Sequence, residues 1–159
     1  MASQTLPVLA LPDDAEKPFE ANSDSGDAEV FLNEGLVIYR GPASDPTWVR
    51  QGSLLITGTE IRIKRVDGVV QTATAIGTPA RFQQQPALDQ EIMHVSGNTI
   101  HFDNAAQTLT IDEAAEFSQG DSNMKAHHID YDLKTRHLNA TRGPGEPVRS
   151  ILQATPRTP

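Results

Sequence analysis

The sequence predicts an all-β protein made of antiparallel strands. One apolar pattern occurs three times, with a second apolar element nine residues after the first. The three copies are Ile61-x-Ile63 with Val70, Ile100-x-Phe102 with Leu109, and Ile129-x-Tyr131 with Leu138. Apolar residues separated by one position share a face of a β-strand. Turn residues separate the segments, and none has a sustained 3.6-residue apolar period, so strands are favoured over helices.

The turn residues predict how the strands are connected. Asp67-Gly68, between residues 61–66 and 69–72, is the strongest hairpin signal, and Asp103-Asn104 and Lys134-Thr135 occupy the equivalent turns of the later copies. Asn33-Glu34-Gly35 predicts a three-residue hairpin with glycine in the left-handed region. Strands joined by such short turns must be antiparallel. Strands of four to seven residues at these intervals give roughly a dozen.

Two further segments contain proline together with other turn-forming residues, and we predict that both are loops. They are residues 41–46 and residues 84–89. Gly58 and Gly97 precede predicted strands in equivalent positions, and we attribute both to turn geometry.

Length and charge restrict the function. The 159 residues suit one domain with a substantial core, and the net charge of −8 argues against nucleic-acid binding. Residues 11–35 contain eight carboxylates and one lysine, whereas residues 121–159 contain six Lys/Arg and four carboxylates. The chain therefore has an acidic N-terminal part and a mildly basic C-terminal part.

The N-terminal segment resembles the end of a secretory signal. Residues 6–10 look like the tail of its hydrophobic region, with Val8 and Ala10 at the small-residue positions before a cleavage point. We interpret residues 1–10 as a residual signal or cloning segment and expect a mature exported protein that begins near Leu11, with one domain over residues 11–153. A disordered native N-terminus is the alternative. Residues 154–159 are expected to form a disordered tail. Apolar runs long enough for a transmembrane helix are missing from the sequence.

No catalytic or metal-binding set is predicted, and no cofactor. The chain has no cysteine, which excludes disulfides and thiolate chemistry. His127 and His128 are adjacent, so they point to opposite faces of a strand and cannot bind one metal without a bulge. Asp130 and Asp132 flank Tyr131 and are expected on a solvated outer face. The motifs of serine hydrolases and phosphate-binding loops do not occur.

The apolar face itself is the remaining candidate. The alternation does not distinguish a packed core from a groove for an apolar ligand, and both interpretations stay open at this point. An extracellular glycan-binding jellyroll would need aromatic platforms, and the sequence has only eight aromatic residues.

Several segments resemble the LptA/OstA-like family of periplasmic lipopolysaccharide-transport proteins. They are residues 39–41, 51–58, 75–83 and 119–131, and the resemblance extends over roughly Lys17 to Gln153. Its most specific element is Gly77-x-Pro79-Ala80-x-Phe82, which follows the Asp-Gly hairpin. The chain departs from the family pattern at residues 42–48, and this insertion is expected to widen an opening of the groove or to add a lid.

The resemblance implies an antiparallel β-jellyroll, an open V-shaped roll, and a non-enzymatic function. That function is to carry lipopolysaccharide through the periplasm from the inner-membrane complex to the outer-membrane translocon. It also implies LptC-like and LptD-like partners that bind by β-strand addition, and head-to-tail self-association. An LptC-type component of the same system is the alternative. We expect the acidic and basic ends to attract each other at a head-to-tail junction.

The predicted site is a groove for the acyl chains of lipid A, whose headgroup is expected to stay in water because the protein is acidic. By the match to the family motif, Phe19 and Ala21 lie on its first strand, at the partner-facing end of the groove. The predicted lining residues are Phe19, Ala21, Ile38, Ile56, Ile61, Ile63, Phe82, Ile100, Phe102, Leu109, Ile111, Phe117, Ile129, Tyr131 and Leu138.

Overall fold

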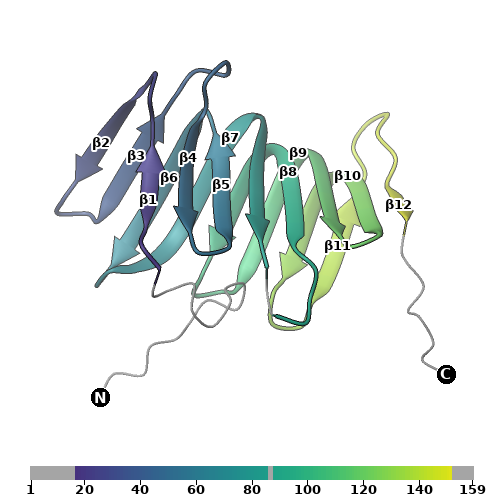
Figure 1. Ribbon diagram of the computed structural model, residues 1–159. Helices are drawn as coiled ribbons and strands as arrows, with labels where there is room; N and C mark the ends of the chain where they lie inside the picture. Colours follow the sequence, from purple (N-terminus) through teal and green to yellow (C-terminus); the bar gives the residue numbers. More distant parts are fainter. Residues whose placement is uncertain (1–16, 86–87, 152–159) are drawn as a thin grey trace.

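The computed structural model describes residues 17–85 and 88–151, and within them the chain forms twelve strands and no helix (Figure 1). This part of the chain accordingly has no helix that could span a membrane. The strands are β1 Glu20–Asn22, β2 Asp27–Phe31, β3 Leu36–Arg40, β4 Thr47–Gln51, β5 Leu54–Gly58, β6 Glu60–Val66, β7 Val69–Gln84, β8 Met93–Asp103, β9 Thr108–Gln119, β10 Ser122–Asp132, β11 His137–Thr141 and β12 Arg149–Ile151. All pairings are antiparallel, which confirms the predicted fold class.

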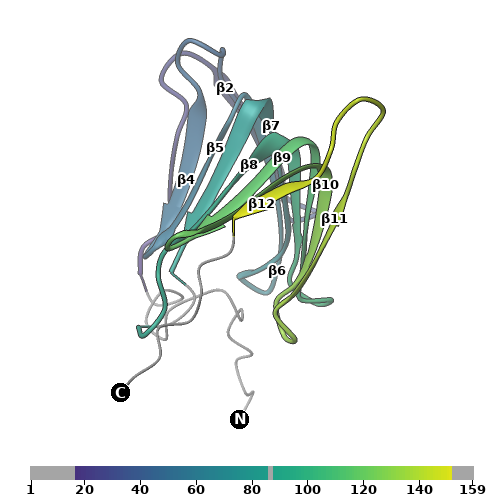
Figure 2. The same cartoon turned by 90° about the vertical axis from the view of Figure 1, so that its right-hand side faces the viewer.

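The strands form one continuous sheet that bends into two layers. The first layer contains β1, β4, β5 and β12, and the second contains β2, β3, β6 and β11. The long strands β7 to β10 contribute one half to each layer: β7 pairs with β6 over residues 69–76 and with β5 over residues 81–83. Figure 2 shows the two layers joined along these long strands and spread apart at the opposite edge.

The bends of the long strands coincide with interruptions of the ladder. The pairing of β7 with β8 is irregular between Ile76 and Ala80, and that of β8 with β9 between Ser96 and Thr99. In β9 the backbone of Glu113 and Ala114 has positive φ. These two residues bulge opposite the single residue His127 of β10, which shifts the register of that pairing. These interruptions follow one another across adjacent strands, so together they form a single line along which the sheet folds.

Gly97 lies on this line and not in a turn. The prediction that turn geometry explains this glycine was therefore wrong. It is buried in the middle of β8, and a Cβ atom built there would overlap Cγ2 of Ile111 on β9. Gly58 ends β5, where a Cβ atom would lie 2.7 Å from the carbonyl oxygen of Ile76. Both positions require glycine because another part of the chain passes close to them.

The Asp67-Gly68 hairpin forms as predicted. Val66 pairs with Val69, and both turn residues have positive φ, as a two-residue turn of type I′ requires. Gly35 likewise takes a positive φ, but four residues and not three separate Phe31 from its partner Leu36.

The turns predicted at Asp103-Asn104 and Lys134-Thr135 are also four residues long, 104–107 and 133–136. The Oδ1 atoms of Asp103 and Asp132 accept backbone N–H groups inside these turns, from Ala106 at 3.0 Å and from Lys134 at 2.9 Å. Such aspartate contacts stabilise a wider turn. Positive φ then falls on Gln107 and Arg136, and no glycine marks either position in the sequence.

The segment that departs from the family pattern is partly loop and partly strand. Residues 42–46 connect β3 in the second layer to β4 in the first, whereas Thr47 and Trp48 begin β4. Thr47 is fully buried, and its hydroxyl donates to the carbonyl oxygen of Asn22 at 2.7 Å. The predicted segments 1–10 and 154–159, and Pro86-Ala87 of the predicted loop, lie outside the described residues.

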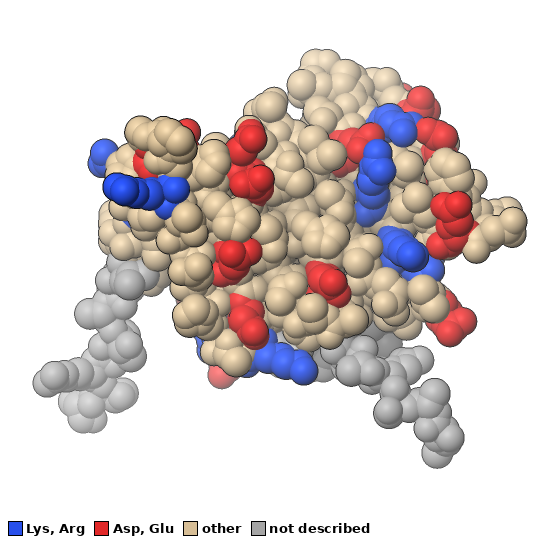
Figure 3. Space-filling view, turned by 180° about the vertical axis from the view of Figure 1, so that it is seen from behind, with Lys and Arg blue, Asp and Glu red and all other residues tan. Residues whose placement is uncertain are grey.

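The outward face of the second layer carries mixed charges. Arg40 on β3 contacts Glu29 and, at 3.7 Å, Asp27 on β2, and its Nε lies 3.2 Å from Glu60 on β6. Figure 3, which views the molecule from this side, shows acidic and basic side chains interspersed over the surface. Ion pairs between neighbouring strands therefore lie on the exterior of this layer, while most of its buried apolar residues face the other way.

Candidate functional site

Apolar side chains from all four long strands meet between the two layers. In the second layer Ile61, Ala75, Ile100, Ile111 and Ile129 are paired in succession from β6 to β10. Each of them is at most 2% exposed. Directly paired residues of a ladder share a face, so one register error would turn this whole row outward.

A second row of the same layer runs parallel to the first. Its members are Ile63, Ala73, Phe102, Leu109, Tyr131 and Leu138, which are paired in that order from β6 to β11. The first layer contributes a comparable row, from β1 to β10. Its members are Ala21, Val49, Ile56, Phe82, Val95, Phe117 and Met124.

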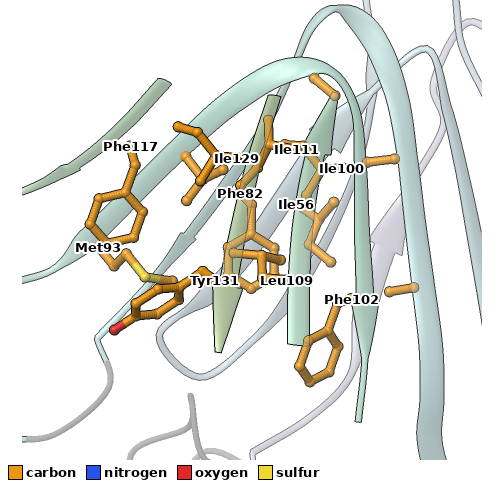
Figure 4. Packing of buried hydrophobic residues seen from close by; sticks show 14 of the residues in the cluster. Ile56, Phe82, Met93, Ile100, Phe102, Leu109, Ile111, Phe117, Ile129 and Tyr131 are labelled. Atoms are coloured by element: carbon orange, nitrogen blue, oxygen red, sulfur yellow. The ribbon is translucent and has the colours of Figure 1, made fainter. Parts of the chain in front are cut away.

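Two aromatic pairs connect the layers. Phe117 of the first layer packs against Tyr131 of the second with ring centroids 5.2 Å apart, and Phe82 lies 6.4 Å from Phe102. Figure 4 shows these rings among the isoleucines of both layers. Tilted pairs at such separations add to the energy of apolar burial. The inward faces therefore form one connected apolar interior.

The structure brings together all of the predicted lining residues except Ile38. Phe19, Ala21 and Leu138 are partly buried and pack against the cluster. The remaining predicted residues are buried members of it: Ile56, Ile61, Ile63, Phe82, Ile100, Phe102, Leu109, Ile111, Phe117, Ile129 and Tyr131.

Ile38 is on the opposite face of the sheet. It pairs with Arg62 on β6 and Glu29 on β2, both of which point outward, although its side chain is only 5% exposed. Val37 and Tyr39 occupy the inward positions of β3, opposite Ile63 and Ile61. Residues 36–39 are all apolar or aromatic, so alternation gave no signal for the orientation of this strand.

Several inward residues were missing from the predicted set. Ala73 and Ala75 pair with Phe102 and Ile100, and their small side chains leave room for these larger partners. Met93 and Val95 on β8 are also buried. Alternation in residues 93–95 and 73–75 is the signal that could have identified them.

Tyr39 and Phe19 lie where the interior meets the surface at the N-terminal end. Both are partly buried and pack against the cluster. Burial raises the pKa of the Tyr39 hydroxyl, and the nearby positive charge of Arg65 opposes that rise. The phenol therefore stays protonated and can donate a hydrogen bond at neutral pH.

The two adjacent histidines lie at a bulge that the sequence analysis did not anticipate. His127 lies opposite the bulged residues 113 and 114 of β9, and the two imidazoles contact different carboxylates. His127 Nδ1 lies 2.9 Å from Glu146, and His128 Nδ1 lies 3.2 Å from Asp112. Within residues 17–85 and 88–151, no three histidine or carboxylate side chains are grouped so that they could hold one metal ion.

The comparisons with known proteins agree with this architecture. Residues 23–137 match the model of the family described as LptA/(LptD N-terminal domain) LPS transport protein. The chain belongs to this family. Among its LptA-type relatives, the lipopolysaccharide export system protein LptH of Pseudomonas aeruginosa is 33% identical over 145 residues, which cover 90% of this chain and 79% of LptH. LptA of Haemophilus influenzae is 30% identical over 149 residues, 91% of this chain and 82% of that protein.

A solved structure extends the likeness to the fold. The crystal structure of P. aeruginosa LptH, described as the LptA-homologous periplasmic component of the lipopolysaccharide transport device, superposes with a TM-score of 0.74 at 26% identity. The match covers 90% of this chain and all of the LptH chain. The fold is therefore the open antiparallel β-jellyroll of an LptA-type protein, as the sequence resemblance implied.

Proposed function

We propose that this protein is a periplasmic bridge that binds lipopolysaccharide and carries it from the inner-membrane complex to the outer-membrane translocon, without catalysing a reaction. The observation that carries the proposal is the continuous apolar interior, which extends from Ala21 on β1 to Leu138 on β11. Membership of a lipopolysaccharide-transport family supports it.

The interior suits acyl chains on energetic grounds. Each methylene moved from water into apolar surroundings contributes about 0.8 kcal/mol, so aliphatic walls can hold a lipid without a charged site. The partly buried residues Phe19, Ala21, Val70 and Leu138 lie where the interior meets the surface, and chains would enter there.

Photo-crosslinking tests the proposal. A photoreactive phenylalanine analogue at Phe102 or Tyr131 replaces one inward aromatic ring by another and changes the core volume little. The matched controls are the neighbouring positions His101 and Asp130, which point outward on the same strands. We expect lipopolysaccharide adducts at Phe102 and Tyr131 only. Equal labelling at all four positions, or none at any, would overturn the proposal.

The sheet edges suit β-strand addition by LptC-like and LptD-like partners and by a second copy of the chain. In the described part of the chain, β1 and β2 at the N-terminal end, and β11 and β12 at the C-terminal end, each have one strand neighbour. Strands with a free edge offer backbone hydrogen bonds to an added strand.

Charge favours a head-to-tail arrangement of copies. Strand β1 begins with Glu20, whereas β12, at the other end of the same layer, begins with Arg149. Sedimentation at increasing salt concentration should show self-association that weakens as salt screens these charges. Association that is insensitive to ionic strength would contradict the charge argument.

A further inference from the structure

Arg65 carries a positive charge on the inward face of β6, near the end of the strand. The bulge opposite Lys64 and Arg65 leaves Gln71 without a partner on β6, so that Lys64 pairs with Thr72 and Arg65 with Val70. Val70 packs against the apolar cluster, and Arg65 shares its face of the sheet. Among the charged residues whose strand pairing the structure describes, Arg65 is alone on the inward face.

The contacts of Arg65 leave most of its hydrogen-bonding capacity available. Its guanidinium carbon lies 5.4 Å from the ring centroid of Phe19, and its Nη2 donates to the carbonyl oxygen of Gly68 at 3.1 Å. A guanidinium group has five N–H donors. Arg40 and Arg62 on the outward face are paired with carboxylates, whereas no ion pair within residues 17–85 and 88–151 involves Arg65.

A guanidinium without an ion pair, beside an apolar interior, is suited to bind the anionic group of an amphiphile where that group adjoins the apolar chains. When acyl chains lie between the layers, the boundary between chains and polar headgroup falls at the edge of the interior. A planar guanidinium forms paired hydrogen bonds with phosphate. Because Phe19 covers one side of the group, an ion pair there is less screened than in open water.

We propose that Arg65 binds a phosphate group of the lipid headgroup and thereby gives the protein a preference for phosphorylated over unphosphorylated lipopolysaccharide. This inference rests on the proposed function and names the residue that would orient the lipid. It also changes the expectation that an acidic protein leaves the headgroup wholly in water, since the net charge says nothing about a single inward cation.

The first test compares two ligands on the unmodified protein. Binding of lipopolysaccharide and of its chemically dephosphorylated form is measured by titration calorimetry, with inorganic phosphate as a competitor in a third arm. We expect the phosphorylated form to bind about tenfold more tightly, on the scale of a charge-assisted hydrogen bond at an exposed site. Inorganic phosphate should not compete, because it has no acyl chains. Competition would assign the site to free phosphate and overturn the headgroup assignment.

The second test uses matched variants. Arg65→Gln should lose the preference, and Arg65→Lys should retain part of it. Lys64→Gln removes the same charge from the outward face of the same strand and should leave the preference unchanged. Binding to the dephosphorylated ligand should be equal in all variants, which a general folding defect would not permit.

The outcomes separate the two proposals. If unmodified protein binds both ligands equally, or if Arg65→Gln keeps the preference, the role of Arg65 is overturned and the lipid-carrying function stands. If unmodified protein binds neither ligand, the proposed function fails, and the role of Arg65 fails with it.

Discussion

His128 on β10 lies beside Asp112 on β9, with 3.2 Å between Nδ1 of the imidazole and Oδ1 of the carboxylate. The other ring nitrogen, Nε2, is 3.0 Å from Oδ2 of Asp130. Only an imidazolium can donate from both nitrogens at once. Burial of the ring lowers the pKa of His128, but the hydrogen bonds and charges of Asp112 and Asp130 together outweigh it and raise the pKa above its usual value.

The raised pKa predicts a pH-dependent contribution of His128 to stability. A histidine whose pKa is higher in the folded state stabilises the protein fully below the pKa of the unfolded chain, and this contribution is lost as the pH rises through the folded-state pKa. His128→Gln should therefore lower the free energy of unfolding by about 0.5–1 kcal/mol near pH 6, and by much less near pH 9. Urea denaturation across this range measures the difference.

The control for this prediction is His94→Gln. His94 is an exposed histidine on the outward face of β8 and has no ion pair within the described residues. Its substitution should leave the pH dependence of unfolding unchanged. A loss of stability in His128→Gln that is the same at every pH would contradict the ion-pair explanation.

Arg40 should stabilise the attachment of the edge strand β2. It contacts Asp27 and Glu29 on β2, and β3 is the one neighbour that β2 has among the described strands. Arg40→Gln should speed amide hydrogen exchange in β2 several-fold, because local opening of an edge strand is governed by its few contacts. Mass spectrometry of exchanged peptides measures this effect. The control is Arg62→Gln, which removes a cation that pairs with Glu60 alone. Amide exchange in β2 should be unchanged in this variant.

Gly97 should be coupled to Ile111 in a double-mutant cycle. Alanine at position 97 would overlap Cγ2 of Ile111, so Gly97→Ala should cost about 1–3 kcal/mol of unfolding free energy. Ile111→Ala removes that atom and costs about 2–5 kcal/mol on its own. In the Ile111→Ala background the additional cost of Gly97→Ala should fall clearly below its value in the unmodified protein. Equal costs in the two backgrounds would show that the overlap with Ile111 is not the cause.

The sequence predicts the strands best where apolar residues alternate with polar ones. Ile61 and Ile63 are separated by Arg62, and both isoleucines face the interior as expected. The prediction fails for Ile38, which lies in an uninterrupted apolar segment. In such a segment the orientation depends on the partner strands, which periodicity does not reveal.

Arg65 escaped the sequence analysis for a different reason. In residues 61–66 it reads as a charged residue beside Lys64 on a solvent-exposed hairpin. Alternation with Ile61 and Ile63 places Arg65 on the inward face of its strand, whereas the bulge at Gln71 turns Val70 inward opposite it, and a bulge leaves little trace in an isolated sequence. The bulge at Glu113 and Ala114 and the four-residue turns were missed for the same physical reason: small changes of register depend on contacts between strands.

The line of bends across β7 to β10 allows the angle between the two layers to change. Apart from the bulge at Gln71, near the hairpin of β6 and β7, the interruptions of the long ladders lie on this line, and the pairing is regular on either side of it. A change in the angle between the layers therefore needs backbone rotation at only a few residues of each long strand, and leaves the cross-strand hydrogen bonds on both sides intact. If the interior holds acyl chains as proposed, its capacity could adjust in this way to ligands with different numbers of chains while the sheet stays whole.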